Sequence, residues 1–70
     1  MNWKEAGILR EAGRKAGVKT DRMGLPPWPG VSESCNSPCF VVFWLNGRDF
    51  EFEDAGEAKE WLLCFMRLAE

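Results

Sequence analysis

The clearest hydrophobic pattern lies in the second half of the chain, where two segments rich in aromatic and β-branched residues flank an Asn-Gly dipeptide. The segments run from Phe40 to Leu45 and from Arg48 to Glu53, with Asn46-Gly47 between them. Asn-Gly favours a two-residue type I′ turn, because both central residues of that turn need positive φ. The pattern predicts an antiparallel β-hairpin with a fixed pairing: Leu45 opposite Arg48, Trp44 opposite Asp49, Phe43 opposite Phe50, Val42 opposite Glu51, Val41 opposite Phe52 and Phe40 opposite Glu53.

The predicted pairing sorts the hairpin side chains into two sets, because successive residues of a strand point to opposite faces of a sheet. One set is apolar and forms the expected core face: Val41, Phe43, Phe50 and Phe52. The other set places an aromatic and β-branched strand beside a strand of carboxylates: Phe40, Val42 and Trp44 with Asp49, Glu51 and Glu53. A plain solvated face would carry polar residues on both strands.

A C-terminal helix is predicted directly after the hairpin. Asp54 and Glu57 have the spacing of a capping box, and an apolar stripe at helical spacing follows them. This stripe would cover the core face of the hairpin, with Leu63 on the opposite, polar side. Its residues are Ala58, Trp61, Leu62, Phe65, Leu68 and Ala69.

An N-terminal helix is predicted from a second capping box, formed by Asn2 and Glu5. Gly17 is typical of a helix C-terminus. Gly7 and Gly13 lie inside this helix, and each weakens it by about 1 kcal/mol relative to Ala, so we expect it to depend on packing against the rest of the domain. The apolar positions at helical spacing are Ile8, Leu9, Ala12 and Ala16.

All four prolines lie between Met23 and Pro38, and we expect this segment to form a long loop. Each proline removes a backbone donor and restricts the residue before it. Trp28 lies among three of these prolines, and we expect its ring to fold back onto the core. The alternative is an exposed binding anchor, because Trp is enriched among the residues that dominate binding energies.

These elements predict a single small α+β domain over residues 1–70. Its expected parts are an N-terminal helix, a long Pro-rich loop, an antiparallel β-hairpin and a C-terminal amphipathic helix packed on the hairpin. With 46% hydrophobic residues, four Trp and five Phe, the chain is too apolar for a disordered segment. A chain of this length buries only about 60% of the surface that its unfolded form exposes, so the core is modest.

Charge is distributed unevenly along the chain. Residues 1–34 contain six Lys and Arg against four Asp and Glu, whereas residues 35–70 contain three against seven. An isoelectric point near 5.1 argues against phosphate binding as the main property.

No apolar run approaches the roughly 20 residues needed to cross a bilayer, and Lys4, Glu5 and Arg10 interrupt any signal-peptide core. Three cysteines are too few for a disulfide framework, so we expect a cytoplasmic protein without membrane contact.

The residues offer little for catalysis or metal binding. The chain has no His and no Tyr, which removes common general acids and bases. Cys35 and Cys39 have no nearby cation to lower a thiol pKa. Structural zinc needs four ligands, and besides Cys35 and Cys39 the chain offers only Cys64 as a further Cys or His ligand. We therefore predict no catalytic residue, no metal and no cofactor. Cys35 and Cys39 are expected to be buried or half-buried at the start of a strand, with a disulfide or an intermolecular metal site as alternatives.

Carboxylates gather around the second half of the hairpin. This group allows two interpretations, either a solvated acidic face or an acidic ridge that docks on a basic groove. The aromatic residues on the same face favour the second, unless the N-terminal helix or the Trp28 loop covers them. The predicted partner-binding residues are Phe40, Trp44, Asp49, Glu51, Glu53, Asp54 and Glu57.

The hairpin and last helix resemble small phage-encoded anti-CRISPR proteins. The resemblance rests on Asn46-Gly47, on Arg48-Asp49-Phe50 and on the acidic segment leading into a helix with Glu60-Trp61. It implies a non-enzymatic inhibitor in the host-cell cytoplasm that acts as a nucleic-acid mimic. The partner would be a host protein or protein–nucleic-acid complex, such as a CRISPR effector. Its basic channel would be bound by Asp49, Glu51, Glu53, Asp54 and Glu57.

Ile8 to Met23 resembles the first helix and turn of a helix-turn-helix, with Ala16-Gly17-Val18 at the turn. A downstream hairpin suits a winged-helix variant. The alternative function is therefore a small DNA-binding regulator, although Gly24-Leu25-Pro26-Pro27 shortens the recognition helix and an acidic wing is repelled by DNA. A homodimer formed through Leu63 or through a free hairpin edge is a further alternative. The basic residues of the regulator would be Arg10, Arg14, Lys15, Lys19 and Arg22.

Overall fold

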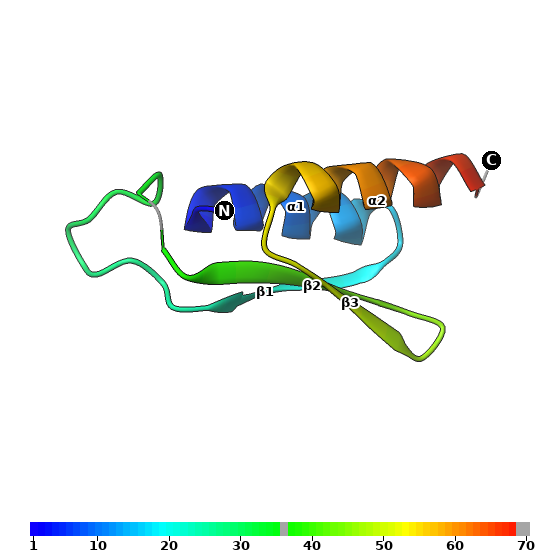
Figure 1. The fold of residues 1–70 in the computed structure, drawn as a ribbon, viewed down its shortest axis with the longest axis horizontal. Helices are drawn as coiled ribbons and strands as arrows, with labels where there is room; N and C mark the ends of the chain where they lie inside the picture. Colours follow the sequence, from blue (N-terminus) through cyan, green and yellow to red (C-terminus); the bar gives the residue numbers. More distant parts are fainter. Residues whose placement is uncertain (36, 69–70) are drawn as a thin grey trace.

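The computed structural model describes residues 1–35 and 37–68, which form two helices and three strands. In chain order these are α1 (Trp3–Lys15), β1 (Lys19–Gly24), β2 (Cys39–Leu45), β3 (Arg48–Phe52) and α2 (Ala55–Leu68). The strands form one antiparallel sheet in the order β1-β2-β3, and both helices lie on the same face of it (Figure 1). The α+β class and the predicted helices and hairpin are therefore confirmed.

The β2–β3 hairpin has the pairing predicted from the Asn46-Gly47 turn. Both turn residues have positive φ, 53° at Asn46 and 78° at Gly47. Pairing runs from Leu45 opposite Arg48 to Val41 opposite Phe52. Since β3 ends at Phe52, the further pair that was expected between Phe40 and Glu53 is not part of the sheet.

Strand β1 was not predicted. It pairs antiparallel with β2 from Lys19 opposite Trp44 to Gly24 opposite Cys39, so β2 becomes the central strand. Its sequence, KTDRMG, lacks the apolar alternation of a typical half-buried strand. β1 also occupies the position where a helix-turn-helix would have its recognition helix. The helix expected there from the resemblance to that motif is therefore wrong.

Helix α1 begins with the predicted capping box. The Asn2 side chain accepts from the Glu5 N–H at 2.7 Å, and the Glu5 carboxylate accepts from the Asn2 N–H at 3.2 Å. The buried face of α1 differs from the predicted stripe, because Ile8 is 60% exposed. Leu9 of that stripe is buried and Ala12 and Ala16 are partly buried, as predicted, and Ala6 and Gly13 are buried beside them. Small residues on this face allow the helix to approach the sheet closely.

The core lies between the sheet and the two helices and is centred on the side chains of β2. Val41 and Phe43 are fully buried there. The Trp61 ring of α2 stacks on Phe43, with centroids 4.7 Å apart, and also packs against Phe50 and Phe65. In the predicted stripe of α2, Ala58 and Leu62 are buried and Trp61 and Phe65 are partly buried, whereas the Leu68 side chain and Ala69 lie outside the described part of the structure.

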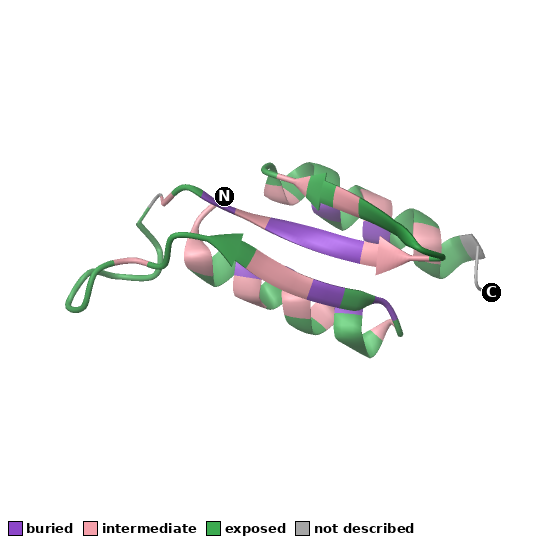
Figure 2. Ribbon diagram, turned by 90° about the horizontal axis from the view of Figure 1, so that it is seen from below, coloured by how far each residue is buried: buried purple, intermediate pink, exposed green. Residues whose placement is uncertain are grey.

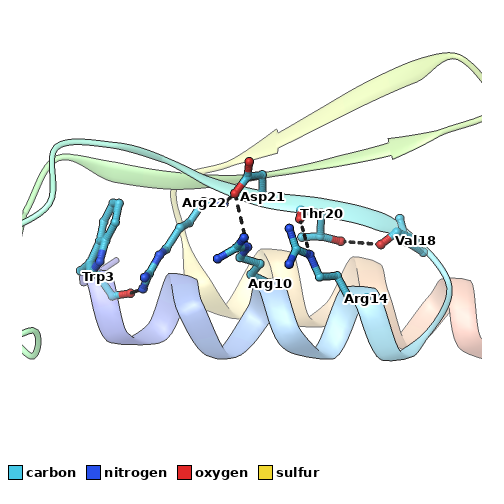
Figure 3. A network of polar contacts seen from close by, with 7 residues as sticks. All are labelled: Trp3, Arg10, Arg14, Val18, Thr20, Asp21 and Arg22. Atoms are coloured by element: carbon cyan, nitrogen blue, oxygen red, sulfur yellow. Dashed lines mark hydrogen bonds and ion pairs between the residues drawn. The ribbon is translucent and has the colours of Figure 1, made fainter.

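Arginine side chains connect α1 to the edge strand β1 (Figure 3). The Arg22 guanidinium lies 4.2 Å from the centroid of the Trp3 ring and donates to the Trp3 carbonyl at 3.2 Å. Arg14 Nε donates to the Thr20 carbonyl at 3.3 Å. Arg10 forms an ion pair with Asp21, at 3.4 Å between Nε and Oδ1. These contacts supply β1 with the attachment that its sequence pattern does not reveal.

Candidate partner-binding surface

The face of the sheet opposite the helices is uncovered by any helix of residues 1–35 and 37–68 (Figure 2). Alternation and register place side chains from all three strands on this surface, which we call the open face. The Pro-rich loop extends beyond the end of the sheet (Figures 1 and 2), and it does not lie across β2 or β3. The open face comprises Lys19, Asp21 and Met23 of β1, Phe40, Val42 and Trp44 of β2, and Asp49 and Glu51 of β3, although the Asp21 carboxylate reaches round the edge of the sheet to Arg10 of α1 (Figure 3).

The central row of the open face is apolar and partly shielded by its neighbours. Phe40 and Trp44 are half-buried, and Val42 between them is only 3% exposed. Lys19 of β1 lies over the Trp44 ring, with its Nζ 5.4 Å from the ring centroid. The two aromatic rings therefore keep contact area for a partner, while the side chains of the flanking strands bury Val42.

The third row of the open face is acidic, and further carboxylates follow it where the chain passes to α2 on the opposite side of the sheet (Figure 1). Asp49 and Glu51 of β3 are exposed, as are Glu53, Asp54 and Glu57 beyond the end of that strand. We call these five residues the acidic row. Asp54 also caps α2, because its Oδ2 accepts from the Glu57 N–H at 3.0 Å. Within the described ranges the one ion pair joins Arg10 to Asp21, so no carboxylate of the acidic row is in an ion pair, while the Met1 ammonium donates to the main-chain carbonyl of Glu53 at 3.0 Å.

Of the predicted site residues, the structure places Phe40, Trp44, Asp49 and Glu51 on the open face, whereas Asp54 and Glu57 lie at the start of α2 on the other side of the sheet (Figure 1). Trp44 lies opposite Asp49, and Val42 opposite Glu51, so aromatic and acidic rows run side by side. The pairing of β1 adds a mixed row that the sequence did not reveal, formed by Lys19, Asp21 and Met23.

The basic residues assigned to DNA binding do not form a free basic surface. Arg22, Arg14 and Arg10 make the contacts between α1 and β1 described above. An open depression of about 450 Å³ runs beside α1, and its charged lining is mixed. Lys4, Lys15 and Arg22 lie there with Glu11 and Glu33. Such a surface lacks the concentrated positive charge that phosphate binding needs.

Trp28 lies far from the core and is 82% exposed, so the expectation that its ring folds back is wrong. A hydrogen bond from the Val31 N–H to the Trp28 carbonyl, at 2.9 Å, closes a turn at this point of the loop. The sequence did contain the alternative, because an isolated Trp in a Pro-rich loop is where binding anchors occur.

The cysteines have three different environments. Cys39 is buried, and its thiol donates to the Met1 carbonyl at 3.2 Å. Cys35 is exposed, contrary to the expectation that it would be at least half-buried, and Cys64 is exposed on α2. The described residues include no group of three potential metal ligands, and they include no helix with the length and apolar character to cross a membrane.

Comparison with known proteins does not assign the chain to a family. No family model matches it, and neither a curated protein nor a solved structure gives a significant match.

Proposed function

We propose that this chain is a small non-enzymatic inhibitor that binds a basic, nucleic-acid-binding surface of a host protein complex through its open face and acidic row. The observation that carries the proposal is the open face itself, where half-buried Phe40 and Trp44 run beside Asp49 and Glu51 with no covering helix. The hairpin and last helix resemble small phage-encoded anti-CRISPR proteins, which makes a CRISPR effector the first partner to test.

The two kinds of side chain have different roles in this proposal. Exposed carboxylates attract a basic partner over a distance, so they mainly speed association and select the partner. Phe40 and Trp44 supply the contact area that gives a complex its lifetime, because buried aromatic anchors contribute most of the binding energy at interfaces. A stable complex buries about 800 Å² on each partner.

Charge reversal tests the acidic row. Glu51→Lys/Glu53→Lys should reduce capture of the partner from host extract at least tenfold, because two attractive charges become repulsive. Glu11→Lys/Glu60→Lys is the matched control, since it makes the same change in net charge at exposed positions on the helices. Unchanged capture by the first variant, or equal loss in both, contradicts a role for the acidic row.

The identity of the captured protein tests the rest of the proposal. We expect a nucleic-acid-binding protein, and purified chain should reduce the binding of DNA or RNA by that partner in a competition assay. Capture of a protein without a nucleic-acid-binding surface would contradict the inhibitor mechanism. Direct binding of the chain itself to duplex DNA, with a steep loss of affinity as salt rises, would favour the DNA-binding regulator instead.

A further inference from the structure

The loop between β1 and β2 exposes three large apolar side chains to solvent. Trp28 is 82% exposed, Leu25 65% and Val31 46%. The loop extends from the end of the domain opposite the Asn46-Gly47 turn (Figure 1), and these three side chains line one shared depression on the loop. Exposed apolar groups of this kind mark interaction sites.

The backbone around Trp28 is restricted before any partner binds. Pro26, Pro27 and Pro29 have φ fixed by their rings. Leu25, Pro26 and Trp28 each precede a proline, which disfavours the helical region and favours extended or polyproline II conformation. Residues 25–28 accordingly belong to no helix or strand.

Hydrogen bonds hold both ends of this segment. At its base, the Leu25 N–H donates to the Pro38 carbonyl at 3.1 Å. At its tip, the Val31 N–H donates to the Trp28 carbonyl at 2.9 Å, with Pro29 and Gly30 at the centre of the turn. Gly30 has a φ of 88°, as the third position of a type II turn requires. A ligand held in this way loses little entropy when it binds.

The loop is also attached to the start of α1. The Lys4 N–H donates to the Glu33 carbonyl at 3.2 Å, and Asn2 Nδ2 donates to the Ser34 carbonyl at 3.3 Å. Trp28 therefore projects from a loop that is connected to both the sheet and the helical layer.

We propose that Pro26 to Pro29, with the Trp28 side chain, is a ligand segment that docks in an aromatic-lined groove of a partner protein. Pro26 and Pro29 have the spacing of a PxxP ligand, and aromatic grooves recognise such segments because their extended conformation is already formed. A membrane surface fits less well, because no Lys or Arg occurs between Met23 and Asn46 to attract anionic lipid. The segment is separate from the open face and does not depend on the function proposed for it.

The proposal is tested with the full chain and a panel of purified domains whose aromatic grooves bind polyproline II segments, namely SH3, WW and EVH1 domains. We expect at least one domain to bind with a micromolar Kd by calorimetry. Trp28→Ala and Pro26→Ala/Pro29→Ala should each weaken that binding at least tenfold. Leu63→Ala is the matched control, since it removes an exposed apolar side chain from α2 and should leave the affinity unchanged.

Several results would overturn the proposal. These are a Kd weaker than about 1 mM for every domain of the panel, equal binding by Trp28→Ala and the unaltered chain, or Trp28-dependent binding to phosphatidylcholine–phosphatidylserine vesicles. Urea unfolding checks that each variant is folded, and the exposure of Trp28 predicts little change there. Glu51→Lys/Glu53→Lys should bind the panel normally, so a failure of the acidic-row proposal is distinguishable from a failure of this one.

Discussion

Gly13 of α1 lies directly against the Thr20 side chain of β1, with no room for a Cβ atom between them. A Cβ on Gly13 would overlap Thr20 Oγ1 and would lie 2.9 Å from Thr20 Cβ and 3.1 Å from Phe43 Cε1. Thr20 cannot easily turn away, because it is 1% exposed and its hydroxyl donates to the Val18 carbonyl at 2.9 Å. A glycine that weakens the helix thus permits a close contact between α1 and the sheet.

Gly13→Ala should therefore destabilise the domain although Ala is the better helix former. The gain in helix propensity is about 1 kcal/mol, whereas forcing an extra carbon into a packed core typically costs about 1–3 kcal/mol. We expect a lower midpoint of urea unfolding. Gly7→Ala is the comparison on the same helix, because its Cβ would meet only the far end of Arg22, 2.8 Å from Nη1. The guanidinium would have to shift from its contacts with Trp3, which offsets the gain in helix propensity, so we expect little net change in the midpoint. A midpoint that rises in both variants would contradict the close contact at Gly13.

The close packing at Gly13 shows why the packing of α1 could not be predicted from the sequence. Periodicity identified a helix, and the capping box placed its start correctly, because both signals are local. Which face is buried depends on the partner surface. The sheet lies so close to α1 that Ala6 and Gly13 face it while Ile8 remains exposed.

Removing the Asn2 cap should destabilise α1 and loosen the Pro-rich loop together. The Asn2 side chain accepts from the Glu5 N–H and also donates to the Ser34 carbonyl. Asn2→Ala loses both contacts, and the loss of an N-cap alone costs about 1 kcal/mol. Asn2→Asp keeps the acceptor but loses the donor, so it should retain most of the stability. Amide hydrogen exchange in residues 31–35 should increase in both variants, and the absence of that increase would contradict the attachment of the loop.

The hairpin turn provides a prediction that is free of packing effects. Gly47 has a φ of 78°, and beyond its chain neighbours Asn46 and Arg48 no residue has an atom within 4 Å of the position that its Cβ would occupy. Gly47→Ala should therefore cost about 1–2 kcal/mol from backbone conformation alone. Gly47→Asn is the control, because Asn tolerates this conformation, and its unfolding midpoint should lie between the other two. An unchanged midpoint in Gly47→Ala would mean that the turn has a different conformation in solution.

The hairpin half of the candidate site could be predicted because a turn of two residues fixes the register of the strands beside it. That register placed Trp44 opposite Asp49 and Val42 opposite Glu51, as the structure confirms. The β1 row could not be predicted, because Lys19 and Asp21 belong to a segment whose strand conformation depends on pairing with β2 and on arginine contacts from α1. Propensity does not detect a strand of that kind.

The stacking of Arg22 on Trp3 should contribute to stability through its planar geometry as well as its charge. The guanidinium lies 4.2 Å from the ring centroid and also donates to the Trp3 carbonyl. Arg22→Lys keeps the charge but loses the flat contact surface, and we expect a loss of about 1 kcal/mol. A double-mutant cycle with Trp3→Leu isolates the contact, because Arg22→Lys should have a smaller effect once the ring is absent. Full additivity of the two substitutions would show that the stack contributes nothing. In that case only the hydrogen bond to the Trp3 carbonyl would hold the Arg22 side chain against α1. Arg22→Lys in the otherwise unaltered chain would then lower the unfolding midpoint only because that hydrogen bond is lost.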